Sequence, residues 1–475
     1  MKKLIFTIFI MLCVACTSPV NRNKAPIADT PQKLMMGELL PIPMANGLHF
    51  YLVRLANYPK FTLSINIDLP HINQDPEQVA RKVLTNAYSK KRSLTFTNGE
   101  IESLPKQLGA MLALNIYGGV IKGMKRNVNQ LLELYTDGLF NPLINNENIS
   151  EVVKKHQQSL AKKAQKIKQF KTPHIKKPLM DNLKNSLLKS SQYDDITVVD
   201  VKQYFRNNIV ANNATVVLVG DFTQAEAKQL SDKYFGYWQQ GELLKPQVNQ
   251  LIKQSVTKQP AVKHRKLVVI DNPTAVQSTI SFKWLLNDAF KFFNKTLELN
   301  LLNEVFGGSQ SSYLYKNLRE EKALCYNISS SLGESTIGGI GTINTHVQTD
   351  KTEYAIENII FEMLRIRNTL VSKSDLFKAK NSLIGKHTRS LSAVNHSPYI
   401  TFAMSKRQYN LPNDYLQTKP SQYYQINQQT IQFMAQQYIK PYEQVITVTG
   451  NVKELRGKLE RFGEVVYLDS SNNPL

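Results

Sequence analysis

Alternating apolar and polar positions predict strands at the start of the chain, and helical spacing predicts the segments that follow. Residues 47–54 and 61–69 alternate like two antiparallel strands. Apolar residues then recur at helical spacing over 75–88, with Pro76 suited to the first helical position. Comparable patterns predict helices over 98–108, 124–139 and 148–168, and a single strand over 110–120.

The same order of patterns occurs twice along the chain. The apolar strand predicted at 214–220 is followed by a helix and a Phe-Gly dipeptide, and so is the strand predicted at 444–450. Residues 267–270 and 279–284 repeat the opening strand pair. The repetition indicates an internal duplication of a domain of about 200 residues.

Strands followed by helices, repeated once, predict an α+β fold of two duplicated domains. We expect each domain to be a mostly antiparallel sheet with helices packed on one face. The N-terminal domain is expected at 39–240 and the C-terminal domain at 265–475. Residues 241–264 are rich in Gln, Lys and Pro and are expected to form the linker.

The first 16 residues have the pattern of a secretory signal. Lys2 and Lys3 precede an apolar run over 4–14, and Ala15 comes directly before Cys16. This arrangement resembles a bacterial lipoprotein box, which implies a signal peptide over 1–16, lipidation of Cys16 and a tether over 17–38. We therefore expect a lipid-anchored envelope protein, in the outer membrane and facing the periplasm. The alternative is an ordinary cleaved signal with an incidental cysteine.

Composition and net charge limit the classes of partner that the chain is expected to bind. A chain of 475 residues with 42% hydrophobic residues is a folded protein of two to three domains. Its net charge of +22 favours acidic peptides or anionic lipid, and no nucleic-acid-binding motif accompanies it, so we expect no nucleic acid partner. The basic run 154–177 is either a solvated helix face or a positive surface for peptide or lipid headgroups.

The candidate chemistry lies in the string LREEKALCY. A helical pattern over 297–306 stops at Gly307-Gly308, and Arg319 and Tyr326 then flank a predicted helix-to-strand turn. A guanidinium and a phenol suit the binding of a peptide carbonyl or carboxylate. Alternatively, Arg319 pairs with a neighbouring glutamate, Glu320 or Glu321, and Tyr326 is only a sheet residue.

This string resembles the Arg/Tyr signature in the C-terminal domain of the M16 (insulinase/pitrilysin, processing-peptidase) family. The resemblance covers about 39–468, with NGLHFYLV, ATVVLVGDF and AVQSTISF as further matching pieces, and Ala323 stands where the family often has Gly. It implies paired domains that face each other around a peptide cavity, and substrate-binding roles for Arg319 and Tyr326.

The zinc motif of that family is missing. Its enzymes carry H-x-x-E-H on the first helix of the N-terminal half, because zinc needs three protein ligands and an open position for water. To within about one residue, Arg81 and Thr85 stand at the His positions and Leu84 at the Glu position. No two of the eight histidines are three to five residues apart. We expect no metal, cofactor or catalytic residue in this chain; a site built from His49, His71 and an acid is the alternative.

The resemblance implies a non-catalytic, supporting subunit of a peptidase. Arg319 and Tyr326 would hold the peptide substrate while a separate M16 chain supplies zinc for metal-dependent proteolysis in the envelope. The alternatives are a peptide-binding, chaperone-like lipoprotein and a structural envelope lipoprotein, both without peptidase function. A peptidase that acts alone is the least supported.

Overall fold

The computed structural model describes residues 38–70, 75–169, 195–243, 264–286, 295–335, 338–391, 397–409, 411–470 and 475. The predicted signal peptide with Cys16, nearly all of the predicted tether, most of the predicted linker and His71 lie outside these ranges. Within them, no helix has the length and apolar character needed to cross a membrane.

The N-terminal half forms a six-stranded sheet in the order β1-β2-β6-β3-β5-β4. Only β2 and β6 pair in parallel, and the other four pairings are antiparallel. The strands are β1 Leu39–Ile42, β2 His49–Arg54, β3 Lys60–Ile67, β4 Met111–Asn115, β5 Gly118–Met124 and β6 Ala214–Gly220. The helices are α2 Asp75–Ser89, α3 Asn98–Gln107, α4 Val128–Phe140, α5 Asn146–Gln169, α8 Val198–Asn208 and α9 Gln224–Phe235.

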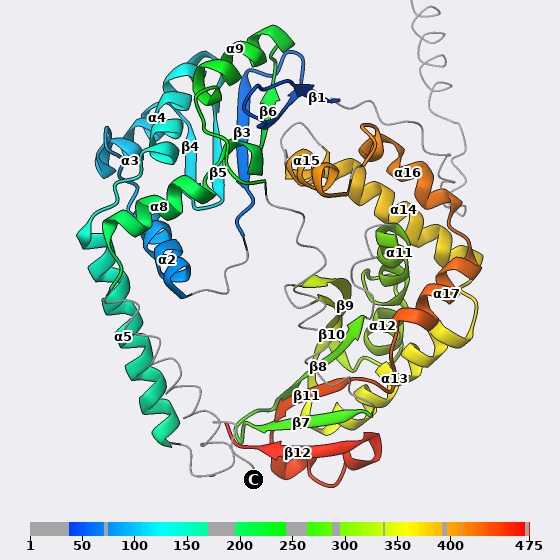
Figure 1. Ribbon diagram of the computed structural model, residues 1–475. Coiled ribbons are helices and arrows are strands. Elements are labelled where there is room, and N and C mark those ends of the chain that lie inside the picture. Colours follow the sequence, from blue (N-terminus) through cyan, green and yellow to red (C-terminus); the bar gives the residue numbers. More distant parts are fainter. Residues whose placement is uncertain are drawn as a thin grey trace, which may run out of the picture. The chain divides into compact units, whose positions relative to one another are not determined.

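The C-terminal half forms a second six-stranded sheet in the order β12-β7-β11-β8-β10-β9 (Figure 1). Its strands are β7 Lys266–Asp271, β8 Gln277–Leu286, β9 Cys325–Ser335, β10 Gly338–Gln348, β11 Val445–Gly450 and β12 Glu464–Leu468. Its helices are α11 Thr296–Phe306, α12 Tyr313–Tyr315, α13 Thr352–Asn368, α14 Lys373–Ser390, α15 Ser397–Tyr409, α16 Tyr415–Gln425, α17 Gln428–Tyr438 and α18 Val452–Leu455. The π-helical turn η5, Lys316–Glu321, follows α12.

The two strand orders confirm the predicted duplication. Strands β2, β6, β3, β5 and β4 correspond in place and pairing to β7, β11, β8, β10 and β9. The sixth strand differs between the halves: β1 precedes β2 in the sequence and pairs with it antiparallel, whereas β12 lies at the end of its half and pairs parallel with β7.

Each sheet packs one face against the helices of its own half, as predicted. In β8, Ile280, Phe282 and Trp284 alternate with more exposed residues and lie in a core shared with α11, α13 and α17. The N-terminal core joins the equivalent face of its sheet to α2, α4 and α9. In addition, the second face of β6 is covered: Val217 and Val219 pack in a separate cluster with Phe402 of α15.

The single strand predicted over 110–120 is wrong. The segment is a hairpin of β4 and β5, with Ile116 and Tyr117 between them. The chain turns at Gly118, which has φ +102°, a conformation that glycine adopts without the steric cost of a Cβ. A Cβ there would also meet the carbonyl oxygen of Ile65 at 2.6 Å.

Candidate functional site

The helix before the Arg–Tyr string ends where the sequence predicts. At Gly307, a Cβ would lie 2.5 Å from Oγ of Ser330, so only glycine lets the end of α11 approach β9 this closely. The Gly307 carbonyl accepts a hydrogen bond from the Ser330 N–H at 3.0 Å. Gly308 is similarly close to Asn303. The glycine pair therefore both ends the helix and seats it on the strand that carries Tyr326.

Arg319 lies on a π-helical turn. In η5 the N–H of Lys322 donates to the carbonyl of Asn317 at 3.1 Å, a spacing of five residues. The turn then closes through the N–H of Leu324, which donates to the carbonyl of Leu318 at 2.8 Å, and through Ala323 at φ +50°. Such π-turns occur frequently at functional sites.

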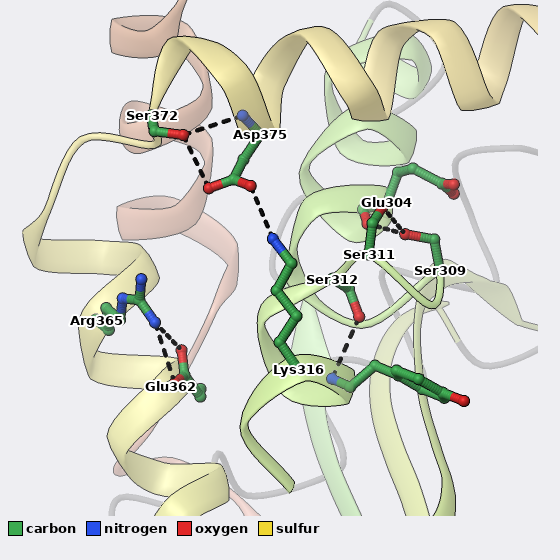
Figure 2. A network of polar contacts seen from close by, with 10 residues as sticks. Glu304, Ser309, Ser311, Ser312, Lys316, Glu362, Arg365, Ser372 and Asp375 are labelled. Carbon is green, nitrogen blue, oxygen red and sulfur yellow. Dashed lines mark hydrogen bonds and ion pairs between the residues drawn. The ribbon is translucent and has the colours of Figure 1, made fainter. Parts of the chain in front are cut away.

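One side of this turn is fastened to α14. Nζ of Lys316 lies 2.9 Å from Oδ1 of Asp375, and Oγ of Ser372 donates to the second carboxylate oxygen at 2.8 Å (Figure 2). The N–H of Asp375 returns a hydrogen bond to Ser372 at 3.0 Å. The carboxylate is therefore held by its own helix N-terminus before it holds Lys316.

The other side is fastened to α13 through a buried acid. Glu362 has no exposed side-chain surface, and its Oε1 accepts a hydrogen bond from Nδ2 of Asn317 at 2.6 Å. Arg365 lies 3.3 Å from the same oxygen (Figure 2). Burial raises the pKa of Glu362 above its ordinary value. Lys316 and Asn317, the third and second residues before Arg319, are thus anchored to two different helices, α14 and α13.

Arg319 itself makes only weak contacts. Its guanidinium lies 4.9 Å from the centre of the Tyr326 ring, and Nη1 is 3.5 Å from the carbonyl oxygen of Cys325. Among the described residues no ion pair joins Arg319 to Glu320 or Glu321, the pairing expected if its role were structural. Tyr326 is 83% exposed. The arginine and tyrosine therefore stack on each other with most of their hydrogen-bonding capacity directed outward.

Both residues line one cavity. It has a volume of about 450 Å³ and is bounded by the π-turn and by the paired ends of β9 and β10. Polar side chains make up much of the wall, among them Gln277, Asn327, Ser329, Asn344, His346 and Gln348. β9 is the last strand of its sheet; at Ser330 its outer edge is bonded to Gly307 and Asn303, so pairing with an extended chain is confined to the part of the edge near Tyr326. Cys325 is buried here and burial raises its thiol pKa, which fits an unreactive thiol.

In the N-terminal half, the three predicted zinc-motif positions have structural partners. Nη2 of Arg81 lies 2.6 Å from the hydroxyl of Tyr117. Thr85 donates from Oγ1 to the Arg81 carbonyl at 2.7 Å. Leu84 is fully buried in the core, where a metal-bound water could not be reached.

The positions on the polar face of α2 that match the zinc motif lie one residue closer to the C-terminus than the predicted ones. Lys82, Thr85, Asn86 and Ser89 line a groove of about 360 Å³ together with Lys155 and His156 of α5. The helical spacing of the apolar residues on α2, which are Val79, Val83, Leu84, Ala87 and Tyr88, could have indicated this face from the sequence. The positions that match an H-x-x-E-H motif on this face are Lys82, Thr85 and Asn86.

Glu151 of α5, the acid on the helix that faces α2, contacts a residue of this groove and is already neutralised. Nζ of Lys90 contacts Oε1, and Nδ2 of Asn86 donates to Oε2 at 3.2 Å. Nζ of Lys155 lies 3.6 Å from the same carboxylate. Hydrogen bonds from Lys90 and Asn86 lower the pKa of Glu151. No group of three His, Cys, Asp or Glu in the described residues is arranged to hold a metal. His71 lies outside those residues, so the His49–His71 alternative is not tested.

Residues 195–383 match a family model described as "Peptidase M16 inactive domain", and this range contains both Arg319 and Tyr326. No curated protein matches the chain.

Solved structures share the fold. The peptidase M16 inactive domain from Pseudomonas fluorescens is 17% identical with a TM-score of 0.64, over 88% of this chain and 98% of that one. A protease from Helicobacter pylori is 14% identical with a TM-score of 0.64, over 87% of this chain and 100% of that one. The periplasmic protease PqqL from Escherichia coli is 13% identical with a TM-score of 0.58, over 91% of this chain and 49% of that one.

At these identities the structures show the fold, and the family model shows the relationship over its matched range. The range begins before α8 and continues into α14, so it joins the end of the first half to the Arg–Tyr region of the second. Residues 195–383 therefore match the inactive domain of the peptidase M16 family, in agreement with the sequence resemblance, and the fold of both halves is that of solved M16 structures.

Proposed function

We propose that this chain is a non-catalytic M16 subunit that binds peptide substrate through Arg319 and Tyr326. A separate, zinc-bearing M16 chain would carry out the hydrolysis. The observation that carries the proposal is the guanidinium of Arg319, which lines an open cavity beside an edge strand without a carboxylate partner among the described residues.

The chemistry of the cavity suits an extended peptide. A guanidinium carries five N–H donors in a planar fork, and only one of them makes even a long hydrogen bond within the described residues. The free donors can bind a peptide carbonyl or an acidic side chain. Main-chain groups along the edge of β9 can add strand-like hydrogen bonds. The net charge of +22 favours acidic peptides during encounter.

The N-terminal half supports the proposal that this chain binds substrate and a partner chain supplies the zinc. The ammonium groups of Lys90 and Lys155 both contact Glu151, and they would repel a metal cation that approached this carboxylate. The zinc, its water and the general base would therefore come from the partner. This chain would contribute alignment, since a misplacement of about 1 Å at the reacting bond can cost about a hundredfold in rate.

We further propose the envelope as its location, with Cys16 as the lipidated residue and the domain boundaries at 39–240 and 265–475. The signal pattern at 1–16 supports this, together with the shared fold of a periplasmic protease. Purification from native membranes, with metal content and co-purifying chains measured together, tests the partner. A zinc-bearing M16 chain recovered with this protein supports the pair, whereas stoichiometric zinc in the isolated chain would contradict it.

The binding role is tested with a fluorescein-labelled, unstructured peptide rich in Asp and Glu. Arg319→Ala should weaken binding about tenfold or more, and Arg319→Lys should restore only part of it because the planar fork is lost. Arg456→Ala is the matched control, since that guanidinium also stacks on a tyrosine, at 4.7 Å from the ring of Tyr467, but does not line this cavity. Equal binding by Arg319→Ala and wild type would exclude the proposed role.

The alternatives predict different results. A chaperone-like protein would bind the same peptide and depend on Arg319, but no M16 partner would turn the peptide over. A structural subunit would bind no peptide, and its Arg319 and Tyr326 would face no cavity, whereas both residues line one here. In a reconstituted pair, unchanged turnover with Arg319→Ala would show that the arginine does not position substrate.

A further inference from the structure

We propose that the C-terminal half contains a second binding site, for an amphiphilic monocarboxylate with a hydrocarbon body, of which a fatty acid is the simplest example. The site is a cavity of about 640 Å³ enclosed by α11, α14, α15, α16 and the far part of β9. It does not depend on the peptide-binding role proposed above. Its volume lies in the range of small-molecule sites, about 300–1,000 Å³.

The wall of this cavity is mainly apolar. Leu299 of α11, Leu332 of β9 and Phe402 of α15 contribute buried side chains, and Leu411 and Leu416 close the side next to α16. Such a surface gains free energy when a hydrocarbon chain replaces water. The body of the ligand is therefore expected to be apolar.

One ammonium group faces this apolar wall. Lys419 of α16 lines the cavity, and within the described part of the chain its Nζ has neither a hydrogen-bond acceptor nor an ion-pair partner. Burial lowers the pKa of Lys419. A desolvated ammonium without a partner is costly, so a carboxylate that enters the cavity would restore the missing interaction.

Neighbouring lysines in the same helical layer show what is missing at Lys419. Lys380 donates to the carbonyl of Tyr424 at 2.9 Å, and Lys406 donates to the carbonyl of Leu411 at 2.8 Å. Lys386 pairs with the buried Glu304 at 2.7 Å. These three amines have protein partners, whereas that of Lys419 is directed to the cavity.

The other polar groups of the wall favour an anion with a single negative charge. Nε2 of His387 lies 2.7 Å from the carbonyl oxygen of Leu416, so this nitrogen carries the proton and donates. Burial and the charge of Lys419 lower the pKa of His387, which favours its neutral form. The hydroxyls of Thr401 and Ser405 can donate to a second carboxylate oxygen, and the described lining residues include no acid.

This cavity is separate from the Arg319 site. Tyr326 lies near the start of β9 and Leu332 six residues later, which corresponds to about 20 Å along a strand. Arg319 does not line the cavity of Lys419, and Lys419 does not line that of Arg319. Variants of one site can therefore be used as controls for the other.

The test compares decanoate, decanol and decyltrimethylammonium by titration calorimetry on the full chain. Decanoate should bind about tenfold to a hundredfold more tightly than decanol, the ratio that a charge-assisted hydrogen bond supplies, and the cation should bind most weakly. Lys419→Met should remove the preference for decanoate and leave decanol binding unchanged. Lys380→Met, which alters a half-buried lysine outside the cavity, should leave both affinities unchanged.

The Lys419→Met variant is expected to fold. Lys419→Met replaces a desolvated charge with an apolar side chain of similar length, so its thermal midpoint should not fall below that of the wild type. Thr401→Trp should fill the cavity and weaken decanoate and decanol together, which locates the site. No decanoate binding to the wild type, equal binding of decanoate and decanol, or an unchanged preference in Lys419→Met would each overturn the proposal.

Discussion

The two halves place different chemistry at equivalent points of the same fold. In each half, helices between two corresponding strands carry candidate polar residues: α2 lies between β3 and β4, and α11, α12 and η5 lie between β8 and β9. On the α2 side, Glu151 is bound by Lys90, Asn86 and Lys155. On the η5 side, Arg319 has only a stacked tyrosine and one long hydrogen bond.

This difference shows that two halves with the same fold can surround a charged side chain in opposite ways. Charges that neutralise one another inside the protein leave nothing for a ligand to complete, and the groove beside Glu151 is of this kind. A charge that is held in place by its neighbours but lacks its own partner is prepared for a ligand. Asn317 and Lys316 hold the backbone of η5, and Arg319 is left to the cavity.

The largest expected effect comes from rebuilding a zinc motif on α2 in two registers. Replacing Lys82, Thr85 and Asn86 with His, Glu and His should give a folded protein, and with Lys90→Ala it should bind zinc through the two histidines and Glu151. The same motif placed at Arg81, Leu84 and Thr85 puts a carboxylate at a fully buried position and should cost about 4 kcal/mol or more.

Guanidinium unfolding and zinc calorimetry on both variants provide the readout, with Lys90→Ala alone as the control. Zinc binding in the Arg81–Thr85 register, and none in the Lys82–Asn86 register, would contradict the assignment of the polar face. It would also remove the basis for treating Glu151 as the acid of a lost site.

The next effect concerns the anchor of the π-turn. Asn317→Ala removes the amide that donates to the buried carboxylate of Glu362, and we expect a loss of about 2–3 kcal/mol in the free energy of unfolding. Peptide affinity should fall as well, although Arg319 is still present, because the turn that aims it is loosened. Urea unfolding measures the first effect, and Glu321→Ala, an exposed change on the same turn, should stay within about 0.5 kcal/mol of wild type.

The buried acid should also give the stability a recognisable pH dependence. Because burial raises the pKa of Glu362 in the folded state, the folded protein keeps this proton at pH values where the unfolded chain, with a pKa of about 4.3, has lost it. The contribution of Glu362 to stability is therefore complete below about pH 4 and decreases as pH rises towards the folded pKa.

Glu362→Gln keeps an oxygen that can accept from Asn317 and removes the titration. Its free energy of unfolding should fall less than that of the wild type between about pH 4 and pH 7, by about 1.4 kcal/mol for each unit of pKa elevation. Urea titrations at three pH values measure this difference. Parallel pH profiles for the two proteins would mean that Glu362 is not held in a desolvated state, and that η5 is anchored in another way.

Local features of both regions could be predicted from the sequence, and features that depend on distant contacts could not. The Gly307-Gly308 stop and the flanking of a turn by Arg319 and Tyr326 follow from neighbouring residues. The register of α2 depends on α5, more than 60 residues away, as the hydrogen bond from Asn86 to Glu151 shows. The cover that α15 provides over Val217 and Val219 depends on residues near 400. The cavity at Lys419 likewise needs five elements to come together.

The smallest expected effect tests the one position where the Arg–Tyr string departs from its family resemblance. Ala323 has φ +50°, the left-handed region in which a Cβ approaches the backbone, and its side chain is exposed, so nothing is gained from packing. Ala323→Gly should therefore stabilise the chain by about 1 kcal/mol, partly offset by the greater freedom of glycine in the unfolded state. Ala225→Gly, at an exposed position in the first turn of α9, should destabilise it, by less than the about 1 kcal/mol that glycine costs in a helix interior. Urea unfolding measures the change in the free energy of unfolding of each variant. Changes of opposite sign would show that the turn beside Arg319 holds Ala323 in a strained conformation. A loss of stability in both variants would show that it does not.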